Sequence, residues 1–409
     1  MNRIFIQIAS YRDPELNNTL EDLIKNSKYP ENLRFGIAHQ RADEDEWDTL
    51  DKYKEDSRFK IIDIPYKKSK GACWARNKIQ QLYDGEEYTL QLDSHHRFEK
   101  NWDEISINLI KELQEDGYSK PLLTAYLPSF TPGAKNNEEK VKVPWGMSFD
   151  RFTPEGVVFF LPYYMEPPPE KPLKTRYFSA HFCFTLGSFA TEVQHDPEMY
   201  FHGEEISLAV RAYTHGYDLF HPNKLIAWHE YTRKGRTKHW DDHNDWVQVN
   251  TNSHQRMRNL LNMEGECTPC IKKSLGKYYL GTTRTLEDYQ SYAGINFRTR
   301  NVQQETLDNT EPPNTPDKEF LSRFKHFLDI NPKWFTEKDE YLGLGIFFEK
   351  NDGTLIYRKD LDKPTFNSLL KRDHIAYPVE FLGEQPDKWI VWAFSEDGWH
   401  ERYEFSLEV

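Results

Sequence analysis

The first hundred residues alternate between short apolar segments and amphipathic segments, and this alternation limits the possible folds more than any other feature. Leu16, Leu20, Leu23 and Ile24 recur at helical spacing, which places them on one face of a helix. Strands are predicted over 3–9, 33–39, 59–64 and 88–93, and helices over 15–26, 43–53 and 71–83. Strands that alternate with helices form right-handed βαβ units around a mainly parallel sheet. We therefore expect an α/β fold with helices flanking the sheet.

Ligands of such folds bind at the carboxyl ends of the strands. This rule selects the stretch after Ile64, residues 93–97 after the fourth strand, and residues 10–13 after the first. A nucleoside would lie at the first strand end, near Ser10, Tyr11, Arg12 and Asp13.

The rest of the chain is less regular. Residues 122–174 contain many loop-forming residues and make either a covering loop over a site or a rigid surface connection. A second structured block is predicted over 178–297. Beyond the Pro-rich linker we expect a helix over 318–328 and strands over 342–349, 354–357, 389–395 and 399–405. The predicted domains are 1–308, a linker 309–317, and a small β-rich domain 318–409.

Composition argues against several classes of protein. Apolar residues make up 37% of the 409 residues, but aromatic residues reach 15%, and their bulk can build a core that the aliphatic content would not. The net charge of −13 argues against nucleic-acid binding, which depends on Lys and Arg contacts to phosphates. No apolar run reaches about 18 residues, so no membrane span is expected, and the amino-terminal residues predict a strand instead of a signal peptide. Four Cys favour a reducing cytoplasm.

The strongest local motif is Leu-Asp-Ser-His-His-Arg-Phe at 92–98. Asp93 and His95 follow an apolar strand, where residues two apart project to the same side. A carboxylate oxygen and an imidazole nitrogen suit Mn²⁺, and Mn²⁺ or Mg²⁺ commonly bridges phosphates with few protein ligands. His229, at the end of a short apolar run, would complete the ligand set. The simpler interpretation makes Asp93 a cap and both histidines structural or surface residues.

Two further motifs carry charged residues that suit a phosphate-bearing substrate. Arg76 follows Gly71, which permits close backbone approach, and an arginine can clamp a diphosphate. Glu204 and Glu205 begin an amphipathic helix. They either contact acceptor or sugar hydroxyls or stabilise the helix dipole as first-turn acids, and the pattern alone favours the second role.

Other clusters predict less. Cys267 and Cys270 form a C-x-x-C motif without a second pair, so zinc would need two further ligands and a turn with incidental thiols is favoured. A solvated loop is likewise favoured for His239, Asp241, Asp242 and His243. The sequence lacks a P-loop, a G-x-S-x-G and a G-x-G-x-x-G motif, which argues against P-loop kinases and nicotinamide enzymes.

In this order along the chain, the segments 10–14, 71–77, 93–98 and 203–205 resemble GT-A nucleotide-sugar glycosyltransferases. More narrowly, they resemble the GlcNAc-transferase family that includes the cytoplasmic hydroxyproline GlcNAc-transferases and the polypeptide α-GlcNAc-transferases of protists. The stretch 274–297 resembles the same family. The resemblance covers about residues 3–300 and nothing beyond about 317.

This resemblance implies a UDP-GlcNAc donor, a divalent ion (Mn²⁺ or Mg²⁺), retention of the α configuration, and a protein or glycan hydroxyl as acceptor. Asp93 and His95 match the D-x-D/D-x-H position. His229 matches the late histidine that completes the metal site in the related mucin-type polypeptide GalNAc-transferases. Glu204 or Glu205 matches the acidic position near the acceptor, where catalysis occurs. Donor contacts are implied for Ser10, Tyr11, Arg12, Asp13, Arg76, Asp93 and Ser94.

Sugar transfer develops negative charge on the departing phosphate and positive charge on the sugar. Front-face attack, with the leaving phosphate helping to deprotonate the acceptor, is favoured over double displacement through Glu204 or Glu205. Two other functions stay open: a metal-dependent hydrolase that uses the same residues on water, and a non-catalytic carbohydrate-binding protein. Exposed Trp residues in the β-rich tail would support sugar binding, whereas buried Trp would indicate an ordinary core.

Overall fold

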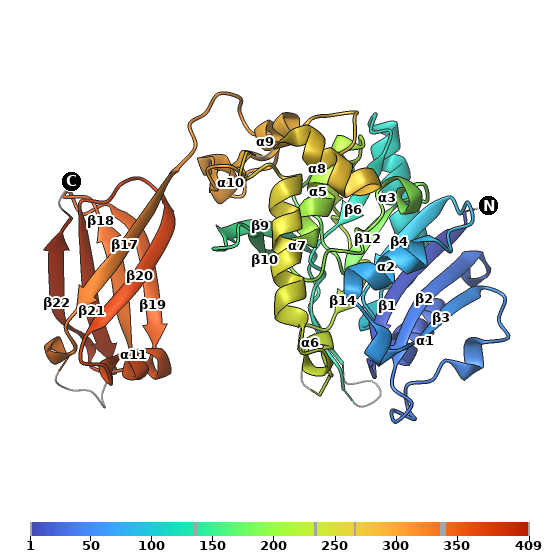
Figure 1. Ribbon diagram of the computed structural model, residues 1–409, viewed down its shortest axis with the longest axis horizontal. Helices are drawn as coiled ribbons and strands as arrows, with labels where there is room; N and C mark the ends of the chain where they lie inside the picture. The colour runs from blue at the N-terminus through green and yellow to red at the C-terminus, as the bar shows by residue number, and fades with distance from the viewer. Residues whose placement is uncertain (1, 134–137, 233–234, 266, 336–340, 408–409) are drawn as a thin grey trace. The chain divides into compact units, whose positions relative to one another are not determined.

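The computed structural model describes residues 2–133, 138–232, 235–265, 267–335 and 341–407. The chain divides into two compact units (Figure 1). The first contains Met1–Thr299 and Glu305–Pro316, and the second contains Arg300–Gln304 and Asp317–Val409. The assignment of 1–308 to a catalytic domain and 318–409 to an accessory domain stays a prediction.

An eight-stranded sheet forms the centre of the first unit, in the order β11-β13-β6-β12-β4-β1-β2-β3. Its strands are β1 (Ile4–Tyr11), β2 (Leu33–Arg41), β3 (Phe59–Pro65), β4 (Tyr88–Leu92), β6 (Pro121–Thr124), β11 (Leu173–Lys174), β12 (Phe182–Leu186) and β13 (Asp218–His221). Four neighbouring pairs are parallel: β1 with β2, β1 with β4, β2 with β3, and β6 with β13. The contacts of β12 and β11 are antiparallel. The predicted α/β class with a mainly parallel sheet is confirmed.

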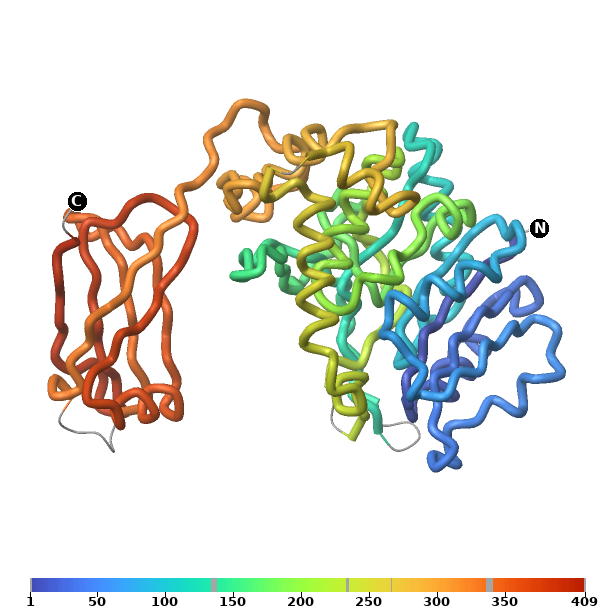
Figure 2. Tube along the Cα trace, viewed as in Figure 1, coloured from blue at the N-terminus to red at the C-terminus, as the bar shows by residue number. Residues whose placement is uncertain are grey.

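Helices cover both faces of this sheet because its strands project apolar side chains to both sides. On β1, Ile4, Ile6 and Ile8 belong to a core cluster that includes the leucines of α1 (Leu16–Asn26) and the apolar face of α3 (Trp102–Glu115). Phe5 of the same strand packs instead with α2 (Ala72–Gln80). This is the period-two alternation of a strand. In Figures 1 and 2 the blue elements β1, β2, β3, α1 and α2 lie together on one side of the first unit.

Further elements complete the first unit. Its other helices are α4 (Phe189–Glu192), α5 (Glu204–Thr214), α6 (His239–Asp242), α7 (Trp246–Leu260), α8 (Thr268–Leu275), α9 (Leu286–Ala293) and α10 (Gln304–Leu307). Its short strands are β5 (His96–Phe98), β7 (Phe130–Thr131), β8 (Glu139–Lys140), β14 (Ala227–His229) and β15 (Ile295–Asn296). Strand β16 (Asn301–Val302) belongs to the second unit. Short 3₁₀ turns are η1 (Pro30–Asn32), η2 (Asp51–Tyr53), η3 (Tyr66–Lys68) and η4 (Gly276–Tyr278).

Two expectations about the first unit need correction. The segment 43–53 is not a helix: it is a series of turns that ends in the 3₁₀ turn η2. Its first four residues are acidic, and its only buried apolar residues, Leu50 and Tyr53, lie at its end. The segment 122–174 is not only loops, since β9 (Trp145–Phe152) and β10 (Val158–Tyr164) form an antiparallel pair.

The second unit is built from β-strands around its own core. Strands β17 (Ser322–Ile330) and β20 (Ile375–Gly383) pair antiparallel. A four-stranded antiparallel sheet has the order β19-β18-β21-β22, with β18 (Gly343–Glu349), β19 (Leu355–Asp362), β21 (Lys388–Ser395) and β22 (Gly398–Ser406). One helix, α11 (Lys363–Leu370), and the turn η5 (Pro332–Trp334) complete the described part.

The four strands predicted in this region are confirmed, but the predicted helix over 318–328 is wrong. Strand β17 occupies most of that segment. Phe324 and Leu328 are four residues apart, a spacing that fits a helix and an alternating strand equally well. In the structure Phe324 and Leu328 face the core, whereas Lys325 and Phe327 are exposed. None of the described helices combines the length and the apolar character that crossing a membrane would require.

Candidate active site

The carboxyl ends of β1 and β4 border a cavity of about 240 Å³ in the first unit. Parallel strands end at the same edge of the sheet, which is why residues 80 positions apart meet there. Segments after β14 close the opposite side. The lining residues are Ala9, Tyr11, Asp13, Asp93, Ser94, His95, Phe201, His229, Glu230, Tyr231, Arg236, Thr237, Lys238, His239 and Trp240.

Asp93, His95 and His229 converge in this cavity. One potential ligand atom from each lies within 4.8 Å of the others. Asp93 Oδ2 is 3.6 Å from His229 Nε2 and 3.8 Å from His95 Nε2, distances too long for hydrogen bonds. Strand β14 pairs antiparallel with β5, and this pairing brings His229 to the motif that contains His95. Among the described residues this is the one group of three or more His, Cys, Asp or Glu side chains spaced to hold a metal ion.

The environment of His229 fits a cation. Its side chain is buried, and neither ring nitrogen has a hydrogen-bond partner among the described residues. A buried polar atom without a partner is costly, and a bound ion would satisfy it. Burial, with the stacked imidazole of His181 4.1 Å away, holds the pKa of His229 well below its usual range. The ring is therefore neutral, the form that binds a metal.

Asp13 orients His95 by contacting Nδ1, the ring nitrogen that does not face Asp93. Its Oδ2 lies 2.7 Å from His95 Nδ1, so an Nδ1–H donated to this carboxylate leaves Nε2 free toward Asp93. Ser94 Oγ donates to the same oxygen at 2.7 Å, and Arg236 lies 3.4 Å away. Burial would raise the pKa of Asp13, but the contacts with His95, Arg236 and the Glu15 amide lower it to about 2. Histidines that bind metals commonly donate their other ring N–H to a carboxylate in this way.

Arg76 fixes the other side of Asp93. Its Nη2 donates to Asp93 Oδ1 at 2.6 Å, and the arginine side chain is buried. Burial would raise the pKa of Asp93, but His229, Arg76 and His95 together hold it well below its usual range. Asp93 is therefore a carboxylate with one oxygen bound to arginine and the other turned toward two imidazoles.

Glu204 and Glu205 do not line this cavity, although the charges of Arg76 and Asp93 act on Glu204. Gly203, with φ of 94°, precedes them, and a Cβ there would lie 2.9 Å from Met257 Sδ. Glu205 accepts hydrogen bonds from the Tyr126 hydroxyl (3.0 Å) and the Ala180 amide (2.8 Å). Burial, and then the charge of Glu204, raise the pKa of Glu205 to about 8. Burial also raises the pKa of Glu204, whose Oε2 has no described hydrogen-bond partner.

The predicted nucleoside segment is partly buried. Ser10 is fully buried, so its side chain does not reach the cavity. Tyr11 lines the cavity and donates its hydroxyl to Asp242 at 2.8 Å. Arg12 bonds Asp45 at 2.7 Å and Asp242 at 3.1 Å. Arg12 therefore joins the end of β1 to two other segments.

Sequence reasoning missed the segment that closes the cavity. Residues 239–243 are not a solvated loop: most of them form α6, and His239 and Trp240 line the cavity with Lys238. His239 Nδ1 lies 2.7 Å from the Tyr200 hydroxyl. The mixture of His, Asp and Trp in a short span was the only sequence signal. Cys267 and Cys270 lie outside the cavity; both are exposed, no disulfide joins them, and the Cys270 thiol donates to Cys267 Sγ at 3.0 Å.

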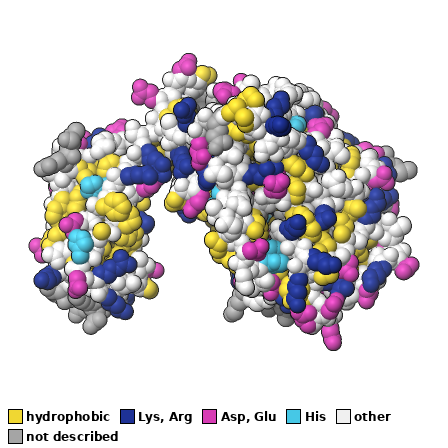
Figure 3. All heavy atoms as spheres, viewed as in Figure 1, with side chains coloured by type: hydrophobic (Ala, Val, Ile, Leu, Met, Phe, Trp, Pro, Cys, Tyr) yellow, Lys and Arg dark blue, Asp and Glu magenta, His cyan; other side chains and the backbone are white. Residues whose placement is uncertain are grey.

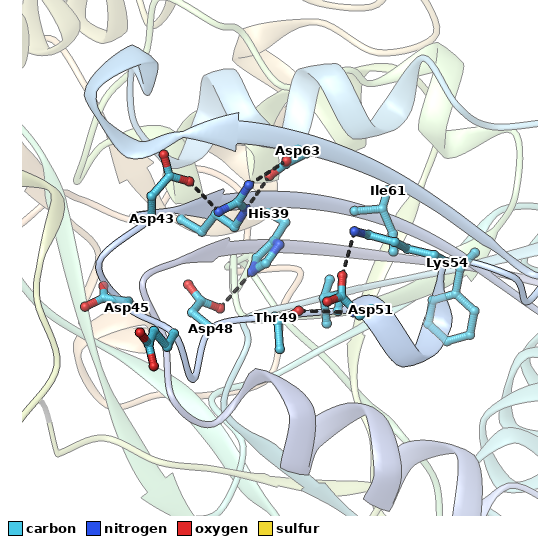
Figure 4. Close-up of a pocket in the computed structure, with 13 residues that line it drawn as sticks. His39, Asp43, Asp45, Asp48, Thr49, Asp51, Lys54, Ile61 and Asp63 are labelled. Carbon is cyan, nitrogen blue, oxygen red and sulfur yellow. Dashed lines mark hydrogen bonds and ion pairs between the residues drawn. The ribbon is translucent and has the colours of Figure 1, made fainter.

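A larger cavity of about 480 Å³ lies beside β2 and β3 (Figure 4). Figure 4 shows His39 turned toward Asp48 and Lys54 toward Asp51; the first pair is 2.7 Å apart and the second 2.6 Å. Arg41 pairs with Asp43 and Asp63. Because these charges are satisfied internally, the smaller cavity with Asp93 is the better candidate site.

The family model described as Glycosyltransferase (GlcNAc) matches residues 3–58 and 51–299, most of the chain. This chain belongs to that family. The matched region of this family member includes every residue of the Asp93–His95–His229 cluster. A search of curated proteins finds no match.

Solved structures show weaker likenesses. GalNAc-T7 with UDP, GalNAc and Mn²⁺ is 11% identical, with a TM-score of 0.46 over 68% of this chain and 55% of that chain. S. aureus TarS 1–349 with UDP-GlcNAc is 12% identical, with a TM-score of 0.38 over 68% and 71% of the two chains. The mannosyltransferase PcManGT from Pyrobaculum calidifontis with GDP-Man and Mn²⁺ is 12% identical, with a TM-score of 0.39 over 67% of both chains. The aligned region thus spans about half the length of GalNAc-T7.

Proposed function

We propose that this glycosyltransferase family member transfers GlcNAc from UDP-GlcNAc to a hydroxyl of a protein or glycan acceptor, with a divalent ion and with retention of configuration. The observation that carries the proposal is the cluster of Asp93, His95 and His229 at the carboxyl ends of β1 and β4. Family membership supports glycosyl transfer. The family description and the resemblance support GlcNAc as the sugar.

Asp93, His95 and His229 would hold the ion, and one oxygen with two imidazoles suits Mn²⁺, with Mg²⁺ as the alternative. Such an ion stabilises the negative charge of a departing diphosphate. The residues of this chain prepare that site: Arg76 holds one oxygen of Asp93, and Asp13 holds His95. The cavity would take the nucleotide beside Tyr11, with Ser94 and Arg12 as supporting donor-side residues, and Ser10 beneath them.

Glu204 and Glu205 stay a prediction as catalytic carboxylates. Both are buried, and neither lines the cavity that contains the Asp93 cluster. We propose front-face attack, in which the leaving phosphate helps to deprotonate the acceptor, over double displacement, in which one of these carboxylates would have to attack the anomeric carbon. We also propose a cytoplasmic location, since none of the four Cys forms a disulfide, as is usual in reducing compartments.

A donor screen tests the proposal. The full chain is incubated with UDP-GlcNAc, UDP-GalNAc, UDP-Glc, UDP-Gal or GDP-mannose, with Mn²⁺ or with EDTA, and the released nucleoside diphosphate is measured. We expect Mn²⁺-dependent release of UDP from UDP-GlcNAc above the other donors. Release that persists in EDTA would contradict the metal role, and preference for another donor would contradict the assignment of GlcNAc.

A further inference from the structure

The four-stranded sheet of the second unit carries aromatic rings on the face that points away from its core. We call Phe347, Trp392, Phe394 and Trp399 the aromatic face. None of the four belongs to the core cluster of this unit. Neighbouring residues on β18 and β21, such as Ile346, Val391 and Ala393, project to the opposite side and pack in that core. Trp399 is 42% exposed.

Strand register and two glycines bring these rings together. Gly345 lies opposite Trp392 and Gly343 opposite Phe394 on the neighbouring strand. A Cβ at Gly345 would come within 2.5 Å of the Phe347 ring and 3.0 Å of the Trp399 ring. The rings therefore lie directly over the backbone of β18. The centroids of Trp392 and Trp399 are 4.8 Å apart, and those of Phe347 and Trp399 are 5.8 Å apart.

Charged groups surround the aromatic face, and each cation there is paired. Arg358 lies over the rings of Phe347 and Trp399, with its guanidinium carbon 5.0 and 5.7 Å from the centroids, and pairs with Asp360 at 3.0 Å. Arg402 pairs with Glu349 and with Glu404, both at 3.0 Å, and Lys388 contacts the same two carboxylates. Among the residues that the structure describes, the face thus combines ring surface with donors and acceptors and leaves none of these three cations unpaired.

From this combination we propose that the aromatic face binds a neutral oligosaccharide. A pyranose ring presents apolar C–H groups on one side and hydroxyls around its edge, so aromatic rings bordered by guanidinium and carboxylate groups match both features. A nucleic acid or an anionic membrane needs unpaired Lys and Arg, which this face lacks. Figure 3 shows basic and acidic side chains interspersed over the side of the molecule that it draws.

This binding needs neither nucleotide nor metal, so it can be tested independently of the proposed transferase activity. Intact protein in EDTA, without nucleotide, is titrated calorimetrically with chitopentaose, cellopentaose, maltopentaose and xylopentaose. We expect at least one sugar to bind. Trp399→Ala should weaken that binding about tenfold or more, because a large contact surface is lost, whereas Trp399→Phe should retain most of it.

Phe327→Ala is the matched control, because Phe327 is 71% exposed on β17 of the other sheet. This variant should bind the sugar as the parent does. The proposal is overturned if none of the four sugars binds at millimolar concentration, or if Trp399→Ala and Phe347→Ala proteins, folded by circular dichroism, bind unchanged. It is also overturned if the face instead mediates dimerisation, seen as a concentration-dependent mass that Trp399→Ala abolishes.

Discussion

His229 is the residue whose surroundings say most about the site. A buried imidazole without a hydrogen-bond partner on either nitrogen destabilises a fold unless something else satisfies it. Among the described residues His229 has no such partner, and its Nε2 lies 3.6 Å from Asp93 Oδ2, while the other oxygen of Asp93 is bound to Arg76. The neighbouring His95 is held in its orientation by Asp13, whose Oδ2 lies 2.7 Å from His95 Nδ1.

Replacing His229 should therefore affect metal binding more than folding. We expect His229→Ala to lower Mn²⁺ affinity about a hundredfold or more, since loss of an outer partner alone costs about 10–100-fold. The measurement is Mn²⁺ titration followed by electron paramagnetic resonance. The control is His39→Ala, which breaks the buried contact with Asp48 and should lower the free energy of unfolding by about 1–3 kcal/mol while Mn²⁺ binding stays intact. Equal Mn²⁺ affinity in both variants would contradict the assignment.

Asp13 should act through His95 as a positioning residue. Asp13→Asn keeps the size of the side chain but removes the charge that fixes the ring, so Mn²⁺ affinity should fall about tenfold. Direct titration calorimetry would measure this. If Asn restores full affinity while Asp13→Ala does not, the carboxylate charge is unnecessary and only its hydrogen bond matters.

We expect Glu205 to make the free energy of unfolding depend on pH. Its pKa is raised from 4.5 to about 8 in the folded state, so the folded protein keeps a proton that the unfolded chain releases. The stabilising contribution is present below about pH 4.5 and is lost as the pH rises toward about 8. We expect the free energy of unfolding of Glu205→Gln, relative to the parent, to rise from about pH 5 to pH 8 in urea titrations. A pH-independent difference would show that Glu205 is ionised when folded.

The residues of the Asp93–His95–His229 cluster could be found from sequence only in part. Asp93 and His95 share a strand end, so their proximity follows from local geometry. His229 lies far along the chain, and its approach depends on the β5–β14 pairing, which local spacing does not specify. Glu204 and Glu205 show the reverse case: they are adjacent in sequence, but the sequence did not predict that both are buried.

At the scale of elements, periodicity predicted the strands and helices that have one clear pattern. Strands β1 to β4 and helices α1 and α2 arise where apolar spacing is unambiguous. The prediction failed at β17, because the spacing of Phe324 and Leu328 fits both the helical period of 3.6 residues and the strand period of two. It also failed at α6, which is too short for a periodic signal.

Two phenylalanines on β17 test the alternation of this strand. Phe324 is 8% exposed and Phe327 is 71% exposed. Phe324→Ala should lower the free energy of unfolding by about 3–5 kcal/mol because it leaves a cavity in the core, whereas Phe327→Ala should change it by about 0.5 kcal/mol or less. Urea unfolding of the two variants would show this difference. Similar decreases in the free energy of unfolding for the two variants would mean that both rings are buried, which would contradict the alternation of β17.

At the scale of the whole molecule, the two units have separate cores. The clusters around β1 and around β18 share no residue, and the candidate active site lies wholly in the first unit. We therefore expect a chain ending at Pro316 to bind Mn²⁺ as the full chain does, measured by the same resonance titration. A folded truncated protein that no longer binds Mn²⁺ would show that the second unit contributes to the site.

The central claim is that Asp93, His95 and His229 hold the ion that binds the donor nucleotide. The most direct measurement is calorimetric titration of UDP into the full chain, with Mn²⁺ and with EDTA, for the parent and for Asp93→Asn. The account predicts UDP binding in Mn²⁺ that is lost in EDTA and is weakened at least about tenfold in folded Asp93→Asn protein. UDP affinity that is the same in EDTA, or unchanged in Asp93→Asn, would contradict it.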